Sequence, residues 1–149
     1  FIYDATEEAR PQYISNFTHA TGCDPVVCDD DIAFVTIHSG TTCNGVINQL
    51  DVLDIKNLAA PVLLDSYPMK SPKGLALTST HLYLCDDGLK ILDRKNPAKL
   101  KMLAHFQDIK VTDAIVLGEK LFLLIGEGGF YQFDITDPLN PTELSKIAI

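Results

Sequence analysis

The sequence lacks an apolar run long enough to cross a membrane. A membrane-spanning helix needs about 18 consecutive apolar residues, whereas the longest uninterrupted run here spans residues 121–125. Basic residues are also few, since 12 Lys and Arg stand against 20 Asp and Glu and the formal net charge is −8. Nucleic-acid binding draws on clustered Lys and Arg, so we expect neither a transmembrane segment nor a nucleic-acid partner.

Basic residues come close together at one place, where four of them fall within residues 94–101. This stretch reads as a turn followed by the start of a strand, and we expect it to be a solvated edge. The chain also lacks an initiator Met and a charged-then-apolar leader. We therefore expect a mature form or a piece of a longer protein, with any export signal already removed.

An internal repeat organises the chain. Four β-type runs end in an aspartate: Asp4, Asp54, Asp93 and Asp134. The steps between these aspartates are 50, 39 and 41 residues, and in three of the four copies a proline stands seven residues further on. Because a carboxylate before a tight turn accepts N–H groups of that turn, we predict an Asx-type structural role for the four aspartates and no shared metal site.

Each repeat of about 40 residues holds four short strand-like runs, which is the length and strand count of a β-propeller blade. The spacing predicts an all-β chain, a single domain or fragment over residues 1–149, built as an arc of about three and a half four-stranded blades. Residues 1–19 supply strands C and D of a partial blade, and full blades follow at 20–67, 68–107 and 108–149. We expect this arc to be part of a larger ring, whose remainder, or another chain, covers the open ends.

Aromatic residues fall inside the strand runs, at positions that predict packing between sheets. They are Tyr3, Phe34, Tyr83, Phe122 and Phe133.

The repeats resemble those of the LVIVD-repeat proteins. The resemblance rests on residues 89–93 and their copies, on the Asp-to-Pro turn, and on the run 48–54. That family consists of predicted β-propellers found mainly in exported and lipid-anchored bacterial proteins. The resemblance implies an exported protein located in the periplasm, at the cell surface or outside the cell, with no established reaction.

Loop residues on one face of the propeller are the candidates for ligand binding, because the D-to-A and B-to-C loops emerge together there. The candidates are His19, Asp24, His38, Asn44, Asp86, Asp87 and Glu127. No paired-histidine zinc motif, complete calcium loop, nucleophile elbow or phosphate loop is present. We therefore predict no catalytic residue, no metal and no cofactor. We interpret 126–129 as a hairpin turn, and 29–31 and 86–88 as solvated tight turns.

Four cysteines are compatible with an oxidising compartment. Cys23 and Cys43 lie in loops of the same blade and on the same face, so we predict a disulfide between them that closes a 20-residue span and stabilises by about 3 kcal/mol. Cys28 ends the first strand of that blade, at the opposite face, and Cys85 ends the second strand of the next blade. Both are therefore predicted to remain reduced.

Two functions remain open. The favoured hypothesis is a non-enzymatic interaction or scaffolding module that presents its propeller loops to a protein or glycan. The alternative is a glycan-acting hydrolase or lyase, with catalytic carboxylates drawn from Asp24, Asp86, Asp87 and Glu127. These carboxylates come from three blades, so the enzyme hypothesis requires two of them to converge, one with a raised pKa.

Overall fold

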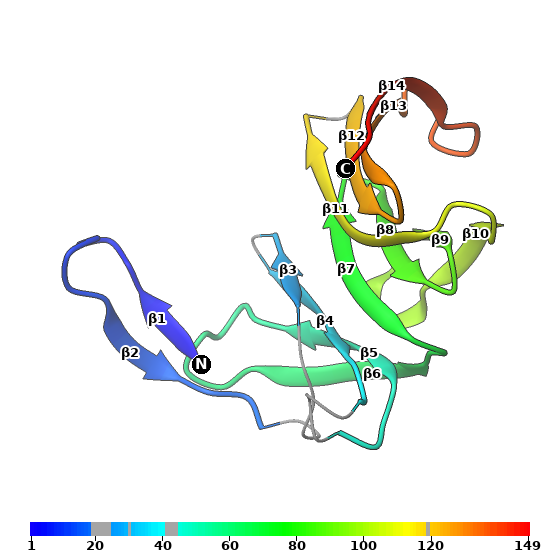
Figure 1. The fold of residues 1–149 in the computed structure, drawn as a ribbon. Helices are drawn as coiled ribbons and strands as arrows, with labels where there is room; N and C mark the ends of the chain where they lie inside the picture. Colours follow the sequence, from blue (N-terminus) through cyan, green and yellow to red (C-terminus); the bar gives the residue numbers. More distant parts are fainter. Residues whose placement is uncertain (19–24, 30, 41–44, 119) are drawn as a thin grey trace.

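The computed structural model describes residues 1–18, 25–29, 31–40, 45–118 and 120–149, with the side chains of 121–124 outside that description. The chain folds into four antiparallel sheets that follow one another along an arc (Figure 1). Short strands β1 (Ile2–Asp4) and β2 (Gln12–Ser15) make a two-stranded sheet. The next sheet contains β3 (Val26–Cys28), β4 (Ile32–Ile37), β5 (Gln49–Asp54) and β6 (Val62–Pro68).

Two more four-stranded sheets complete the arc. One is built from β7 (Pro72–Leu77), β8 (His81–Asp86), β9 (Leu89–Asp93) and β10 (Lys101–Phe106), with the short 3-10 helix η1 (Pro97–Lys99) before its last strand. The other is built from β11 (Val111–Leu117), β12 (Leu121–Gly126), β13 (Gly129–Asp134) and β14 (Thr142–Ile147).

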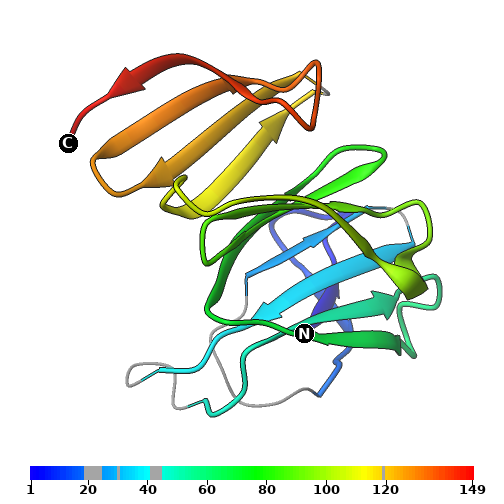
Figure 2. The same ribbon diagram turned by 90° about the vertical axis from the view of Figure 1, so that its right-hand side faces the viewer.

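Within every sheet the strands lie side by side in chain order, so each sheet is a simple meander. The first strands of neighbouring sheets meet, since β7 contacts both β3 and β11. Figure 2 shows the sheets as successive blades seen from the side. The predicted fold class is confirmed: the chain is an arc of three four-stranded blades preceded by half a blade.

The repeated aspartate ends the strand at the third position of each blade, and it makes the predicted Asx bond. The backbone N–H two residues later donates to its Oδ1 in all four copies, at 2.8, 2.9, 2.9 and 2.7 Å for Asp4, Asp54, Asp93 and Asp134. A backbone turn then closes at matching positions, for example from Ala60 N to Asn57 O at 2.9 Å. The repeated aspartate is therefore a turn-forming device, as its recurrence predicted.

These turns predict an acid titration that can be measured. Hydrogen bonds from the backbone and side chain of Thr136 hold the pKa of Asp134 below its ordinary value of 3.8. We expect carboxyl-carbon NMR to show Asp134 titrating below that value, and Thr136→Val to move the midpoint upward by removing the hydroxyl donor while keeping the backbone donor. The unaltered chain is the reference. A midpoint for Asp134 that ignores the substitution would contradict the role of the side-chain bond.

Apolar side chains from facing sheets fill the spaces between blades. Phe34 and Val52 of one blade pack against Leu75, Leu82 and Leu84 of the next. The following interface combines Tyr83 and Ile91 with Val111 and Phe133. The predicted core positions of Phe34, Tyr83 and Phe133 are confirmed, with exposures of 0%, 0% and 7%.

Tyr3 corrects the prediction made for the aromatic residues. Its side chain is 52% exposed and makes an edge-on contact with Tyr13, which is 55% exposed. The reason is the position of β1 and β2 at one end of the arc (Figure 1), where no other described sheet covers their outer face. The side chain of Phe122 lies outside the description.

Arg94 corrects the prediction of a solvated basic edge. Its side chain is only 9% exposed, forms an ion pair with Asp29 of the preceding blade, and lies over the Phe34 ring with Cζ 5.5 Å from the ring centroid. Its guanidinium also donates to Thr78 O at 2.8 Å. The remaining lysines of the stretch are exposed, so only the arginine has become part of an interface between blades.

No helix in the described part of the chain is long and apolar enough to cross a membrane.

Candidate functional site

The candidate site lies on the face where the D-to-A and B-to-C loops emerge. The turn joining β8 to β9 has Asp87 at φ 52° and Gly88 at φ 109°, the two successive positive values of a type I′ hairpin turn. Residues 127–128 join β12 to β13, and in this turn Gly128 has a positive φ, of 84°, while Glu127 does not. Both stretches are tight turns, as predicted, and they hold Asp87 and Glu127 at the loop face. The prediction that 86–88 is solvated is wrong for Asp86, which is buried.

Asp86 lies beneath this face. Its carboxylate has no solvent exposure and accepts a hydrogen bond from Lys90 Nζ at 2.6 Å. It also accepts from the backbone N–H groups of Lys70 and Ser71. Burial alone would raise the pKa of Asp86, but these donors hold it below the ordinary value. The residue predicted to bind a ligand therefore clamps the chain entering β7 to the end of β8.

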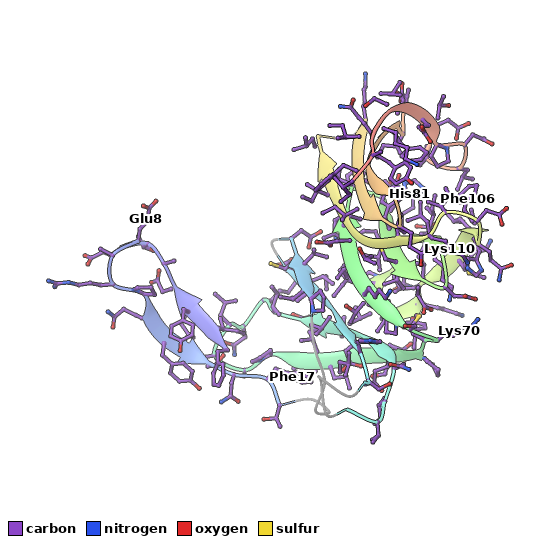
Figure 3. The ribbon with its side chains drawn as sticks, viewed as in Figure 1. Glu8, Phe17, Lys70, His81, Phe106 and Lys110 are labelled. Carbon is purple, nitrogen blue, oxygen red and sulfur yellow. The ribbon has the colours of Figure 1, made fainter. Side chains whose placement is uncertain are left out.

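Asp87 lines a small depression between the second and third full blades. The depression measures about 140 Å³, and its polar lining includes Lys73, Lys110, Thr112 and Glu127. Lys70, labelled with Lys110 in Figure 3, pairs with Asp87 at 2.9 Å between Nζ and Oδ2. Mainly because of this bond, the pKa of Asp87 is lowered. Two of the candidate carboxylates, Asp87 and Glu127, thus converge from adjacent blades.

A second and larger depression lies beside the first, where the starts of the three inner strands meet. It measures about 390 Å³ and is lined by Pro25, His38, Pro72, Lys73, Gly74, Thr112 and Asp113. His38 follows β4 directly, and its buried Nδ1 has no hydrogen-bond partner in the described part of the structure. Lys73 and Thr112 line both depressions, so these two residues belong to both parts of the candidate site.

Several sequence candidates lie outside the described residues. These are His19, Asp24 and Asn44, together with both members of the predicted Cys23–Cys43 disulfide. The disulfide therefore stays a prediction. Cys28 and Cys85 are free thiols, as predicted. Burial, with the nearby Asp113 carboxylate adding to it, raises the pKa of Cys85 to about 12, so this thiol is unreactive near neutral pH.

The two remaining histidines make local contacts away from one another. His105 bonds through Nε2 to Asp87 O at 2.8 Å, and His81 bonds through Nδ1 to the Thr80 hydroxyl at 2.9 Å. Over the described residues no group of three or more His, Cys, Asp or Glu side chains is arranged to hold a metal ion.

Sequence reasoning missed Lys73, Lys110, Thr112 and Asp113 as site residues. All four stand at or just before the first strand of a blade, which is where a D-to-A connection reaches the loop face. Strand order alone places such positions on the loop face, and this is the signal by which the sequence could have identified them. Thr36, on β4, donates through its hydroxyl to Lys73 O at 2.7 Å, which fixes the start of β7 against the preceding blade.

No protein-family model matches the chain, and no curated protein matches it. Solved structures do. The N-terminal domain of Nup159 superposes with a TM-score of 0.50 and 17% identity, over 83% of this chain and 30% of that one. AztD from Citrobacter koseri superposes with a TM-score of 0.53 and 18% identity, over 82% and 34%. A functionally unknown protein from Desulfotomaculum acetoxidans DSM 771 gives a TM-score of 0.60 and 9% identity, over 97% and 62%.

These similarities concern the fold. The neighbours Nup159 and AztD are β-propellers, and the match to them supports the β-propeller class for this chain. The chain spans less than two thirds of the length of each of these neighbours.

Proposed function

We propose that this chain is a non-enzymatic interaction module of an exported bacterial protein of the LVIVD-repeat type, and that its loop face binds a protein segment carrying carboxylate groups. The observation that carries this proposal is the state of two of the candidate carboxylates, Asp86 and Asp87. Asp86 is buried in an ion pair, and Asp87 is paired with Lys70. The pKa of each is lowered, whereas a general acid needs a raised one.

The polar groups that remain at the site favour an acidic partner. Lys73 and Lys110 form no salt bridge with any residue in the described ranges, and His38 Nδ1 is unpaired there. Asp113 already accepts the N–H of Ala114 at 2.9 Å. A carboxylate entering the larger depression would meet the Lys73 ammonium and the imidazole of His38, and it would restore a hydrogen bond to a buried nitrogen.

The test is the titration of a hexaglutamate peptide into the protein, followed by amide NMR and calorimetry. We expect shift changes confined to the loop face, and binding weakened about fivefold by Lys73→Ala, which is the size of one exposed charge pair. Lys99→Ala, in η1 on the opposite face, is the matched control, and hexaglutamine is the neutral probe. Equal binding of both peptides, or equal loss in the control variant, would contradict the proposal.

The enzymatic alternative is tested with the unaltered chain and two further variants. Asp87 and Glu127 line one depression. If these carboxylates were catalytic, Glu127→Gln and Asp87→Asn would each abolish the hydrolase or lyase activity. We expect no cleavage of a panel of acidic and neutral oligosaccharides by the unaltered chain. Cleavage that disappears in Glu127→Gln would replace the interaction hypothesis with the enzymatic one.

A further inference from the structure

An apolar groove separates the two-stranded sheet from the first full blade. It measures about 340 Å³. Phe1, Ile2 and Phe17 form one wall, and residues of β3, β4 and β5, among them Val35 and Leu53, form the other. Phe17 is labelled in Figure 3, at the chain segment leading away from β2. Cys28 also lines the groove and is exposed.

The groove occupies a place that is filled at the other interfaces between blades. Between the first and second full blades, Phe34 of a second strand and Val52 of a third strand belong to one apolar cluster with residues of the following blade. At the groove, the partly buried residues that pack against the cluster of Ala33, Val35, Ile37 and Leu53 within the described part of the chain are Phe17 and Ile55. A side chain equivalent to Phe34 is missing from the described residues on this side.

The strand bordering the groove also has a free edge. In the described structure β1 pairs with β2 alone, whereas the corresponding strands β5, β9 and β13 each pair on both sides. An unpaired strand edge presents N–H and C=O groups that accept a further strand. The free edge of β1 therefore lies beside the apolar groove. The edge can bond the backbone of a further β-strand, and the groove can hold the apolar side chains on one face of that strand.

We propose that this groove and the free edge of β1 accept a two-stranded β-hairpin joined to β1 by a short turn. The other three sheets argue for two strands, because two precede the strand equivalent to β1 in each. The inference does not depend on the loop-face function proposed above. A second copy of this chain is the competing occupant.

The register specifies which side chain enters the groove. Ile2 stands two residues before Asp4, as Val52 stands before Asp54 and Ile91 before Asp93. Phe34 lies opposite Val52 and Tyr83 lies opposite Ile91, and both aromatic side chains are fully buried. In the third full blade Leu123 lies opposite Gln132, two residues before Asp134. The hairpin therefore places a large apolar side chain, aromatic in two of the three full blades, opposite Ile2 in the groove.

The chain contains a hairpin suited to test this. Residues 70–89 include β7, β8 and the turn leading into β9, and Leu89 precedes Lys90, the counterpart of Phe1 three residues before the repeated aspartate. A copy of residues 70–89 fused directly before Phe1 brings its tyrosine, the copy of Tyr83, opposite Ile2. We expect the thermal unfolding midpoint of the 149-residue chain to rise by about 5 °C or more.

Cys28 supplies a local readout. We expect the fused hairpin to slow the reaction of Cys28 with a thiol reagent about tenfold, because exposure would then require opening of the added strands. Mass spectrometry assigns the label to Cys28, and Cys85 stays unlabelled in every variant because it is buried.

The controls are a fusion of the same 20 residues in scrambled order and a fusion in which the copied tyrosine is replaced by aspartate. Equal stabilisation and equal protection of Cys28 by the scrambled sequence would overturn the proposal. An unchanged or lowered midpoint in the hairpin fusion would also overturn it. Protection of Cys28 that increases with the concentration of the unfused chain would assign the groove to a second copy instead.

Discussion

Replacing Asp86 by alanine is expected to lower the free energy of unfolding by about 3 kcal/mol, the cost of removing one partner from a buried ion pair. The Lys90 ammonium, 18% exposed, would lose its carboxylate. The N–H groups of Lys70 and Ser71 would lose their acceptor at the entry to β7. Urea unfolding followed by circular dichroism measures the effect, and the thermal midpoint should fall by about 10 °C.

The contribution of Asp86 also depends on pH. Its pKa is lower in the folded chain than its ordinary value of 3.8, so its ionised form stabilises the fold above about pH 4 and loses this effect as pH falls through the folded pKa. The difference between the unaltered chain and Asp86→Ala should be complete at pH 7 and narrow below pH 4. Asp87→Asn, at an exposed pair, is the control and should change stability much less than Asp86→Ala. Equal stability of both variants would contradict the clamp.

Replacing Gly74 by alanine is expected to cost about 2 kcal/mol through overpacking where two blades meet. A Cβ atom at this position would lie 2.6 Å from Cα of Asp113, on the adjacent first strand β11. Backbone cannot move aside as a flexible side chain can, so β7 and β11 would have to separate. Chemical unfolding measures the loss, and hydrogen exchange should show weaker protection along both strands.

Lys73→Ala is the matched control for this substitution. Lys73 precedes Gly74 on β7 and is exposed, so its replacement should leave stability within about 0.5 kcal/mol. Asp113→Ala combined with Gly74→Ala should restore part of the loss, because it removes the contact with the carboxylate and leaves the contact with Cα. A Gly74→Ala protein as stable as the control would show that the strands are not held at this distance.

Local repetition made the fold predictable. The aspartate, the turn and the strand runs recur with a period near 40 residues. Each repeat forms its own local hydrogen bonds, such as the bond from Lys56 N to Asp54 Oδ1. The partial first blade was predicted from the same count of strand-like runs. The loop face was predicted from strand order, and Asp87, Glu127 and His38 do line its depressions.

The roles of individual site residues were less predictable. Asp86 and Asp87 are neighbours in an acidic turn and look equivalent in the sequence, yet one is sealed in an ion pair and the other borders a depression. Asp86 acquires its structural role because the segment between β6 and β7 brings the N–H groups of Lys70 and Ser71 to its carboxylate. Lys73 lies in the site because the start of β7 borders both depressions.

The amino-acid sequence by itself determined the meander of each blade, the Asx turns and the number of strands, because these depend on contacts between residues close together in the chain. Only the tertiary structure decided how one blade meets the next. Arg94 reaches Asp29 and Phe34 across a blade boundary, and Gly74 accommodates the backbone of Asp113 across another. Such contacts depend on the angle and spacing of whole sheets, which are set by the combined packing of many side chains.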